Sequence, residues 1–114
     1  MTVEISEKDG VAVVAPEGRL VAACSEDLRA TVAAHLETNS RVVFDLAKMT
    51  HIDSSGLGVL VQLLQKAKDQ GGAVKLANLQ PHPRIVFDIT KVYRVFEIYD
   101  SLDLALASFA GAAG

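Results

Sequence analysis

Acid, hydroxyl and glycine residues occur together near the middle of the chain, at Asp53-Ser54-Ser55-Gly56. An apolar pattern of helical period follows directly, so this run is expected at a helix N-terminus. Unpaired N–H groups and about half a positive charge make such an end suitable for an anion such as a phosphoryl group. The same residues are also typical of a simple helix cap. Residue types and spacing therefore leave both a structural cap and a site for a phosphoryl group open.

Other reactive residues do not form a recognisable catalytic or metal-binding pattern. Ser54 could act as a nucleophile with His51 or His82 as its base, but the run is not a Gly-x-Ser-x-Gly elbow and no third residue is identifiable as an orienter. We interpret His35 as a surface helix residue and the other two histidines as loop residues without metal-ligand spacing. Cys24, a lone cysteine, is interpreted as a small residue at a helix entry. We expect no enzyme activity, metal or cofactor.

The elements that must position the central run alternate along the whole chain. We predict strands near residues 3–6, 11–15, 41–46, 73–77 and 96–99, and helices near residues 25–38, 54–70, 83–90 and 101–109. Asp9-Gly10 predicts a tight hairpin turn between the first two strands, and Pro16 and Gly18 predict a break or bulge after the second. The alternation indicates a single α/β domain over residues 1–114. We expect a mixed sheet of about four to five strands, an opening hairpin plus parallel strands, with about four helices.

Several local patterns support these elements. Ser25 is the predicted N-cap of the first helix, and residues 41–46 (RVVFDL) read as a central strand buried on both faces. The buried stripe of the second helix is predicted to be Leu57, Leu60, Val61 and Leu64. The third helix is expected to carry Ile85, Val86 and Ile89. We expect residues 110–114 to fray at the C-terminus.

Composition limits the classes of function. The chain has 114 residues, of which 50% are hydrophobic and 22% charged, as expected for one ordinary globular domain. The net charge is −3 and the 11 Lys and Arg residues are scattered, so nucleic acid is not an expected partner. No apolar stretch approaches the roughly 18 to 20 residues that would span a bilayer, and the N-terminus lacks a signal-segment pattern. We therefore expect a cytoplasmic protein without membrane insertion.

The segment from Val42 to Gly58 (VVFDLAKMTHIDSSGLG) closely resembles the signature of STAS-domain anti-sigma factor antagonists. In that family an apolar strand ending in an Asp-Leu-like pair leads to Asp-Ser-Ser-Gly-Leu-Gly. The resemblance continues in matching order through Gly71-Gly72, residues 74–76 (VKL), residues 86–90 (VFDIT), residues 96–101 (FEIYDS) and Ala105. It therefore covers nearly the whole chain.

The resemblance implies a bacterial partner switch. The unphosphorylated antagonist binds an anti-sigma factor that is also a serine kinase, and so frees a sigma factor. The kinase phosphorylates the serine after the aspartate, and a phosphatase resets the cycle. Carried over, Ser54 is the phosphoacceptor, Asp53 orients or polarises its hydroxyl, and Ser55 helps to form the loop and cap the helix. The partner-binding loop and helix N-terminus are Asp53, Ser54, Ser55, Gly56, Leu57 and Gly58.

One position departs from the family pattern. Family members often carry an aspartate after the Gly-x-Leu of the second strand, where this chain has Val21. Arg19, Val21 and Glu26 are our candidates for a further partner surface, and Glu17 or Asp27 could also supply the missing charge. Lys48 is the nearest basic residue in sequence to Ser54, so we expect phosphate to act by repulsion at a partner interface, with little refolding.

Two alternatives to the antagonist remain open at this point. The chain could be a STAS module of a signalling assembly, or an accessory subunit of a membrane transporter, that binds partners without a sigma factor. It could also form a weak homodimer through the Ala-rich tail of residues 107–114 and the apolar edge of the opening hairpin.

Overall fold

One mixed sheet organises the protein, and the computed structural model describes residues 1–112 of it. The elements in chain order are β1 (Thr2–Lys8), β2 (Val11–Leu20), α1 (Ala22–Leu36), β3 (Arg41–Asp45), β4 (Met49–Ile52), α2 (Ser54–Asp69), β5 (Ala73–Ala77), α3 (Pro81–Thr90), the short 3₁₀ helix η1 (Val92–Arg94), β6 (Ile98–Tyr99) and α4 (Leu102–Ala112). The sheet order is β1-β2-β3-β5-β6, and β4 also pairs with β2. The predicted α/β class with an opening hairpin and parallel strands is confirmed, with one strand more than expected.

The opening hairpin forms at the predicted turn. Asp9 and Gly10 have φ angles of 54° and 78°, the left-handed values that a two-residue turn requires at both central positions. β1 and β2 then pair antiparallel from Thr2–Glu17 to Lys8–Val11, whereas the other neighbours in the sheet are parallel.

The long strand β2 has two successive partners. Its first half pairs with β3, and its last residues, Gly18 to Leu20, pair with β4. The register shifts between Gly18 and Arg19, which is the irregularity that the glycine predicted. Because β4 lies beside the end of β2, the chain leaves both strands at the same place, and α1 and α2 begin next to each other.

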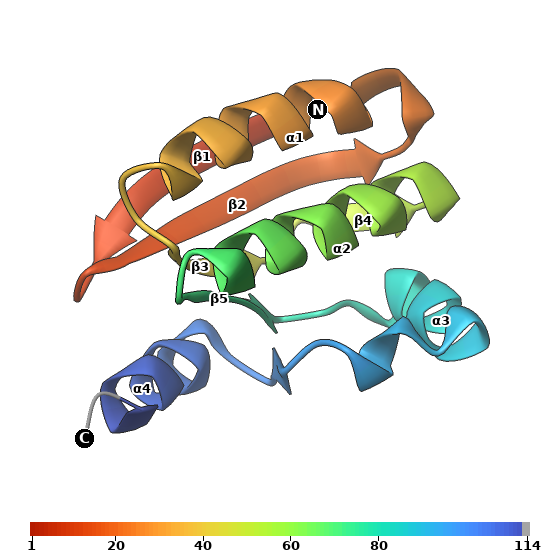
Figure 1. Ribbon diagram of the computed structural model, residues 1–114. Coiled ribbons are helices and arrows are strands. Elements are labelled where there is room, and N and C mark those ends of the chain that lie inside the picture. The colour runs from red at the N-terminus through yellow and green to blue at the C-terminus, as the bar shows by residue number, and fades with distance from the viewer. Residues whose placement is uncertain (113–114) are drawn as a thin grey trace.

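The two faces of the sheet carry different helices. Ala12 and Val14 of β2 pack in the main core with the buried side chains of α1 and α2. Val11 and Val13 point to the other face and pack with Ala105, Leu106 and Phe109 of α4. Figure 1 shows α1 and α2 running alongside each other, with α4 apart from them and α3 near the end of the sheet where β4 lies.

A buried lysine joins α4 to the sheet. Lys75 of β5 is 5% exposed, and its Nζ donates a hydrogen bond to Ser108 Oγ at 2.8 Å. The same Nζ lies 4.3 Å from the ring centroid of Phe109 and 3.7 Å from a carboxylate oxygen of Glu97. A buried ammonium group needs such partners because removal from water disfavours its charge.

Four local predictions were wrong. α1 begins at Ala22, and Ser25 is a buried residue inside it whose hydroxyl donates to the Ala22 carbonyl at 3.4 Å. Residues 49–52, treated as loop, form β4; only its outer residues are buried, so the segment lacks a strand alternation. On α2 the side chain of Val61 is 38% exposed, and Leu63 packs in the core instead. The histidines His51 and His82, read as loop residues, lie in β4 and α3.

The structure describes only part of the C-terminal segment, residues 110–114, that was expected to fray. α4 extends to Ala112, and Ala113 and Gly114 lie outside the described residues. The fraying expected for residues 110–114 therefore stays a prediction. Within residues 1–112, no helix combines the length and the apolar character needed to cross a membrane.

Candidate functional site

The carboxylate of Asp53 joins the N-termini of two helices. One oxygen, Oδ1, accepts a hydrogen bond from the N–H of Gly56 at 3.0 Å and so caps α2. The other oxygen, Oδ2, accepts from the N–H of Ala22, the first residue of α1, at 3.1 Å. Because each helix N-terminus carries partial positive charge, one carboxylate placed between two of them stabilises both. The sequence left a helix cap open without deciding which residue supplies it, and the resemblance assigned capping to Ser55; the structure shows that Asp53 is the cap. The sequence gave no sign of the bond to α1.

The backbone of Asp53 is held as well. Its N–H donates to the Leu20 carbonyl at the end of β2 at 3.3 Å, and its carbonyl accepts the first helical bond of α2 from Leu57 at 3.0 Å. Both carboxylate oxygens accept from backbone N–H groups, so Asp53 holds the starts of α1 and α2 in place. Orientation of the Ser54 hydroxyl by Asp53 stays a prediction.

Val21 is the N-cap residue of α1 and gives no side-chain cap. Its backbone is extended, with φ −127° and ψ 175°, and its carbonyl accepts from the N–H groups of Cys24 and Ser25 at 3.0 Å each. An aspartate at this position would stand where a capping oxygen is preferred. The Asp53 carboxylate supplies part of the missing cap of α1, because it accepts a hydrogen bond from the Ala22 N–H.

Ser54 and Ser55 are the first two residues of α2, and both are exposed. Each hydroxyl is therefore accessible to another protein. The helix that follows is anchored by its buried face, with Leu57, Leu60 and Leu64 in the main core. The position of Ser54 is thus fixed by its surroundings although its own side chain is free in solvent.

Gly56 and Gly58 have different surroundings. A Cβ atom on Gly56 would lie 2.6 Å from the Leu20 carbonyl oxygen and 2.8 Å from the Leu20 side chain, so the close backbone approach at this glycine is to β2 of the same chain. A Cβ on Gly58 would meet nothing within 4 Å. Of the two glycines proposed for a partner contact, only Gly58 is therefore open to one.

The other candidates for a partner surface lie on either side of this site. Arg19 is exposed and pairs in register with His51 of β4. Glu26 is one turn into α1, where Arg29 Nε donates to both its carboxylate oxygens at 3.0 and 2.9 Å. That hydrogen bond, with the nearby charge of Arg29, lowers the pKa of Glu26. Arg19 and Val21 therefore flank the Asp53 region, whereas Glu26 is already paired.

Sequence reasoning missed a pair of histidines. The rings of His51 in β4 and His82 in α3 meet edge to face, with centroids 4.6 Å apart, and both residues are exposed. They are distant in sequence, so only the packing of α3 against β4 brings them together. With Arg19 beside His51, the basic and imidazole groups near Asp53 come from three elements. Across residues 1–112, no group of three or more His, Cys, Asp or Glu residues is arranged to hold a metal ion.

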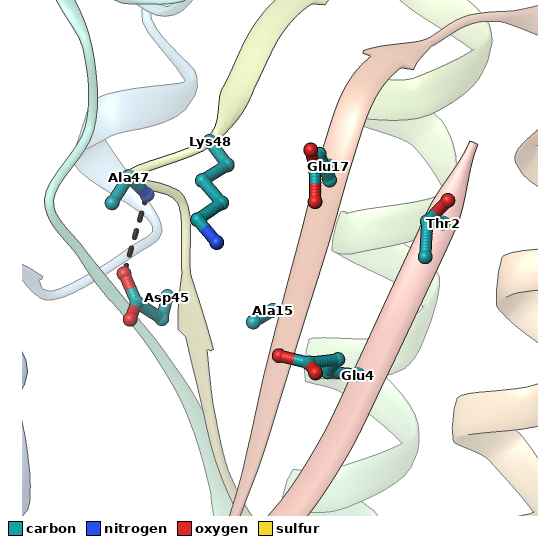
Figure 2. Close-up of a pocket in the computed structure, with 7 residues that line it drawn as sticks. All are labelled: Thr2, Glu4, Ala15, Glu17, Asp45, Ala47 and Lys48. Atoms are coloured by element: carbon teal, nitrogen blue, oxygen red, sulfur yellow. Dashed lines mark hydrogen bonds between the residues drawn. The ribbon is translucent and has the colours of Figure 1, made fainter.

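A shallow acidic hollow lies elsewhere on the sheet, between β1, β2 and the turn after β3. It has a volume of about 130 Å³ and is lined by Thr2, Glu4, Ala15, Glu17, Asp45, Ala47 and Lys48. Figure 2 shows the Lys48 side chain extending into the hollow, with Glu4 and Glu17 on the side of β1 and β2. The Asp45 carboxylate turns instead to the N–H of Ala47, which donates to its Oδ1 at 3.2 Å. Lys48, the nearest basic residue to Ser54 in sequence, therefore lies in this hollow and not at the start of α2.

Comparison with known proteins agrees with this fold. The family model of the STAS domain matches residues 2–105. BtrV of Bordetella bronchiseptica, provisionally named an anti-sigma factor antagonist, is 31% identical over 110 residues, covering 96% of this chain and 95% of BtrV. A Thermotoga maritima structure with the same provisional name has a TM-score of 0.88 at 23% identity, covering 93% of this chain and 92% of that one. The phosphorylated form of the Bacillus cell fate determinant SpoIIAA has a TM-score of 0.74 at 17% identity, covering 95% of this chain and 99% of SpoIIAA.

The fold and the matched range define this protein as a single STAS domain. The chain belongs to the family of STAS-domain anti-sigma factor antagonists, as the resemblance in the sequence indicated.

The two glycines of α2 give a first test. Gly56→Ala is expected to lower the free energy of unfolding by about 1–3 kcal/mol, because its methyl group would overlap the Leu20 carbonyl. The matched change Gly58→Ala should leave stability unchanged or raise it by up to about 1 kcal/mol, since alanine favours a helix and the space is empty. Urea denaturation of both variants measures the difference. Equal stability of the two variants would contradict the close approach at Gly56.

The double cap gives a second test. Asp53→Ala should lower the free energy of unfolding by about 1–3 kcal/mol, because two N–H groups lose their acceptor. Asp53→Asn keeps one acceptor oxygen and should lose less. Amide hydrogen exchange should become faster at both Ala22 and Gly56 in Asp53→Ala. Asp27→Ala, an exposed acid on α1, is the control and should change stability by less than about 0.5 kcal/mol. Faster exchange at Gly56 alone would refute the link to α1.

Proposed function

We propose that this protein is an anti-sigma factor antagonist that switches partners through the phosphorylation state of Ser54. In its unphosphorylated form it binds an anti-sigma factor serine kinase and thereby releases a sigma factor. Phosphorylation of Ser54 by that kinase ends the complex, and a phosphatase restores it. It acts in the cytoplasm by protein–protein binding, without a cofactor or a catalytic step of its own. The observation that carries the proposal is an exposed serine at the start of a helix whose N-terminus is fixed by Asp53.

The geometry favours a switch based on charge. A phosphoryl group adds about 1.5 to 2 negative charges, and it would do so on the residue that directly follows Asp53. The helix dipole offsets only about 0.3 to 1 kcal/mol of the resulting repulsion at an exposed position. Asp53 is held by two helices and by β2, so it is poorly placed to move away. The added charge would therefore act on the partner.

The relatives support the same reading. A relative of this chain, BtrV, is named as an anti-sigma factor antagonist. SpoIIAA, which shares the fold, has a known structure in its phosphorylated form. The proposed binding surface is the exposed part of the loop and helix start, Ser54, Ser55 and Gly58, with Arg19 and Val21 beside it; Gly56 and Leu57 are buried. Gly58 leaves room on that surface for the partner's backbone.

The central test uses the protein as bait in an extract of its native cell. Wild type and Ser54→Ala should each recover an ATPase-type kinase that mass spectrometry identifies, and Ser55→Ala should do the same as the matched control. Ser54→Asp should bind that kinase roughly tenfold or more weakly, because a fixed negative charge faces the interface. Retention of every partner by Ser54→Asp would count against the switch.

The second part of this test measures the intact mass of each form of the protein after incubation with that kinase and ATP. Wild type and Ser55→Ala should each gain one phosphoryl group, and Ser54→Ala should gain none. A module of a signalling assembly or an accessory subunit of a transporter should recover no such kinase and gain no phosphoryl group.

A further inference from the structure

The exposed apolar side chains of this protein are concentrated at α3 and η1. Among the described residues, seven large hydrophobic side chains are exposed, and four of them fall within residues 85–95. These are Ile85, Ile89, Tyr93 and Val95, with exposed fractions of 55%, 75%, 42% and 52%. Exposed apolar residues are ordinary when they are scattered, but a group of them in one short segment marks a place where another molecule binds.

Folding of the domain does not explain these residues. α3 is attached to the core by other side chains, above all Phe87, which is fully buried and meets the ring of Phe96 with centroids 6.5 Å apart. Ile85 and Ile89 lie four residues apart, hence on one side of the helix, and point into solvent. Isoleucine is also a weaker helix former than the usual polar surface residues. Their presence on the outer side of α3 adds nothing to the core and little to the helix.

Charged residues at this surface identify the kind of partner. Arg84, Lys91 and Arg94 are exposed and are interspersed in sequence with these apolar residues. With Asp88 as the one acid, residues 81–95 carry a formal charge of +2, although the whole chain carries −3 and the remainder therefore −5. A basic rim around apolar side chains is complementary to an acidic surface that has apolar side chains of its own.

The same surface is close to the proposed switch. α3 packs against β4, and His82 in its first turn contacts His51, two residues before Asp53. Figure 1 shows α3 and the N-terminal end of α2 at the same end of the sheet. A protein that covers the Ser54 loop can therefore reach α3 without crossing the body of the domain.

We propose that Ile85, Ile89, Tyr93 and Val95, with the basic rim of Arg84, Lys91 and Arg94, form a second docking surface for an acidic protein partner. This inference rests on the proposed function, in which the partner is the anti-sigma factor. The Ser54 loop supplies the regulated part of the interface, and the α3–η1 surface supplies affinity and choice of partner that phosphorylation leaves intact. Asp88, one residue before Ile89 and three after Ile85, puts a carboxylate within the apolar group, which disfavours an anionic lipid surface as the occupant.

The test compares exposed apolar side chains on two different helices. The double variant Ile85→Ser with Ile89→Ser removes the apolar group of α3. Leu104→Ser on α4 is the matched control, because Leu104 is 54% exposed and Ile85 is 55% exposed. A third variant, Arg94→Glu, reverses one charge of the rim, with Arg41→Glu as its control on β3. Circular dichroism and thermal melts establish that each variant is folded.

Proteins captured from the native extract by each variant are identified by mass spectrometry, and the partner is then purified for affinity measurements at two salt concentrations. The double variant should raise the Kd roughly tenfold or more, as loss of a central apolar contact does at interfaces, and Leu104→Ser should change it less than about twofold. Arg94→Glu should weaken binding most at low salt, because its effect is electrostatic.

The outcomes separate this inference from the proposed function. If the kinase binds the double variant with an unchanged Kd, the docking surface is overturned and the switch at Ser54 stands. If the captured partner is an acidic protein without kinase activity, yet its binding depends on Ile85 and Ile89, the docking surface stands and the proposed function fails. The docking surface is also overturned if no captured protein is lost from the double variant. Binding to phosphatidylglycerol vesicles that requires Ile89 would overturn it as well, in favour of a membrane.

Discussion

The Asp53 carboxylate lies between the N-termini of α1 and α2 and accepts one backbone N–H from each. That contact is possible only because β4 runs beside the last residues of β2, which brings the starts of the two helices together. It also needs Gly56, since a side chain there would overlap the Leu20 carbonyl. A negative charge shared by two helix ends is a favourable arrangement, and it fixes the geometry of the loop that carries Ser54.

This constraint explains how one small domain can combine a stable scaffold with a regulated surface. The buried face of α2 belongs to the main core, so the helix cannot easily shift, while Ser54, Ser55 and Gly58 remain exposed. A new charge at Ser54 would then change what the surface can bind and leave the packing beneath it in place. The apolar surface of α3 and η1 lies at the same end of the sheet and would give a partner a second contact that does not depend on that charge.

Sequence patterns were sufficient to predict the elements that have characteristic turn residues or a regular apolar face. The hairpin at Asp9-Gly10, the central strand of residues 41–45 and the helix starting at Ser54 were all predicted, because turn chemistry and apolar periodicity are local signals. β4 was missed because it is short and its two inner residues are exposed, and α1 was started too late because Val21 has no capping side chain. The Asp53–Ala22 bond and the His51–His82 contact join residues about thirty positions apart. Contacts of that kind depend on tertiary packing and leave no periodic trace in a single sequence.

The most direct measurement compares amide NMR spectra of the unphosphorylated protein and of the protein synthesised with phosphoserine at position 54. The account predicts chemical-shift changes confined to the Ser54 loop, the first turns of α1 and α2, and the adjoining end of α3. Slow exchange at Ala22 and Gly56 should persist in both forms, because the Asp53 carboxylate keeps both helix ends capped. Shift changes spread through β3, β5 and α4, or loss of protection at Ala22 and Gly56, would show that phosphate refolds the domain and would contradict a switch that acts by charge at a fixed surface.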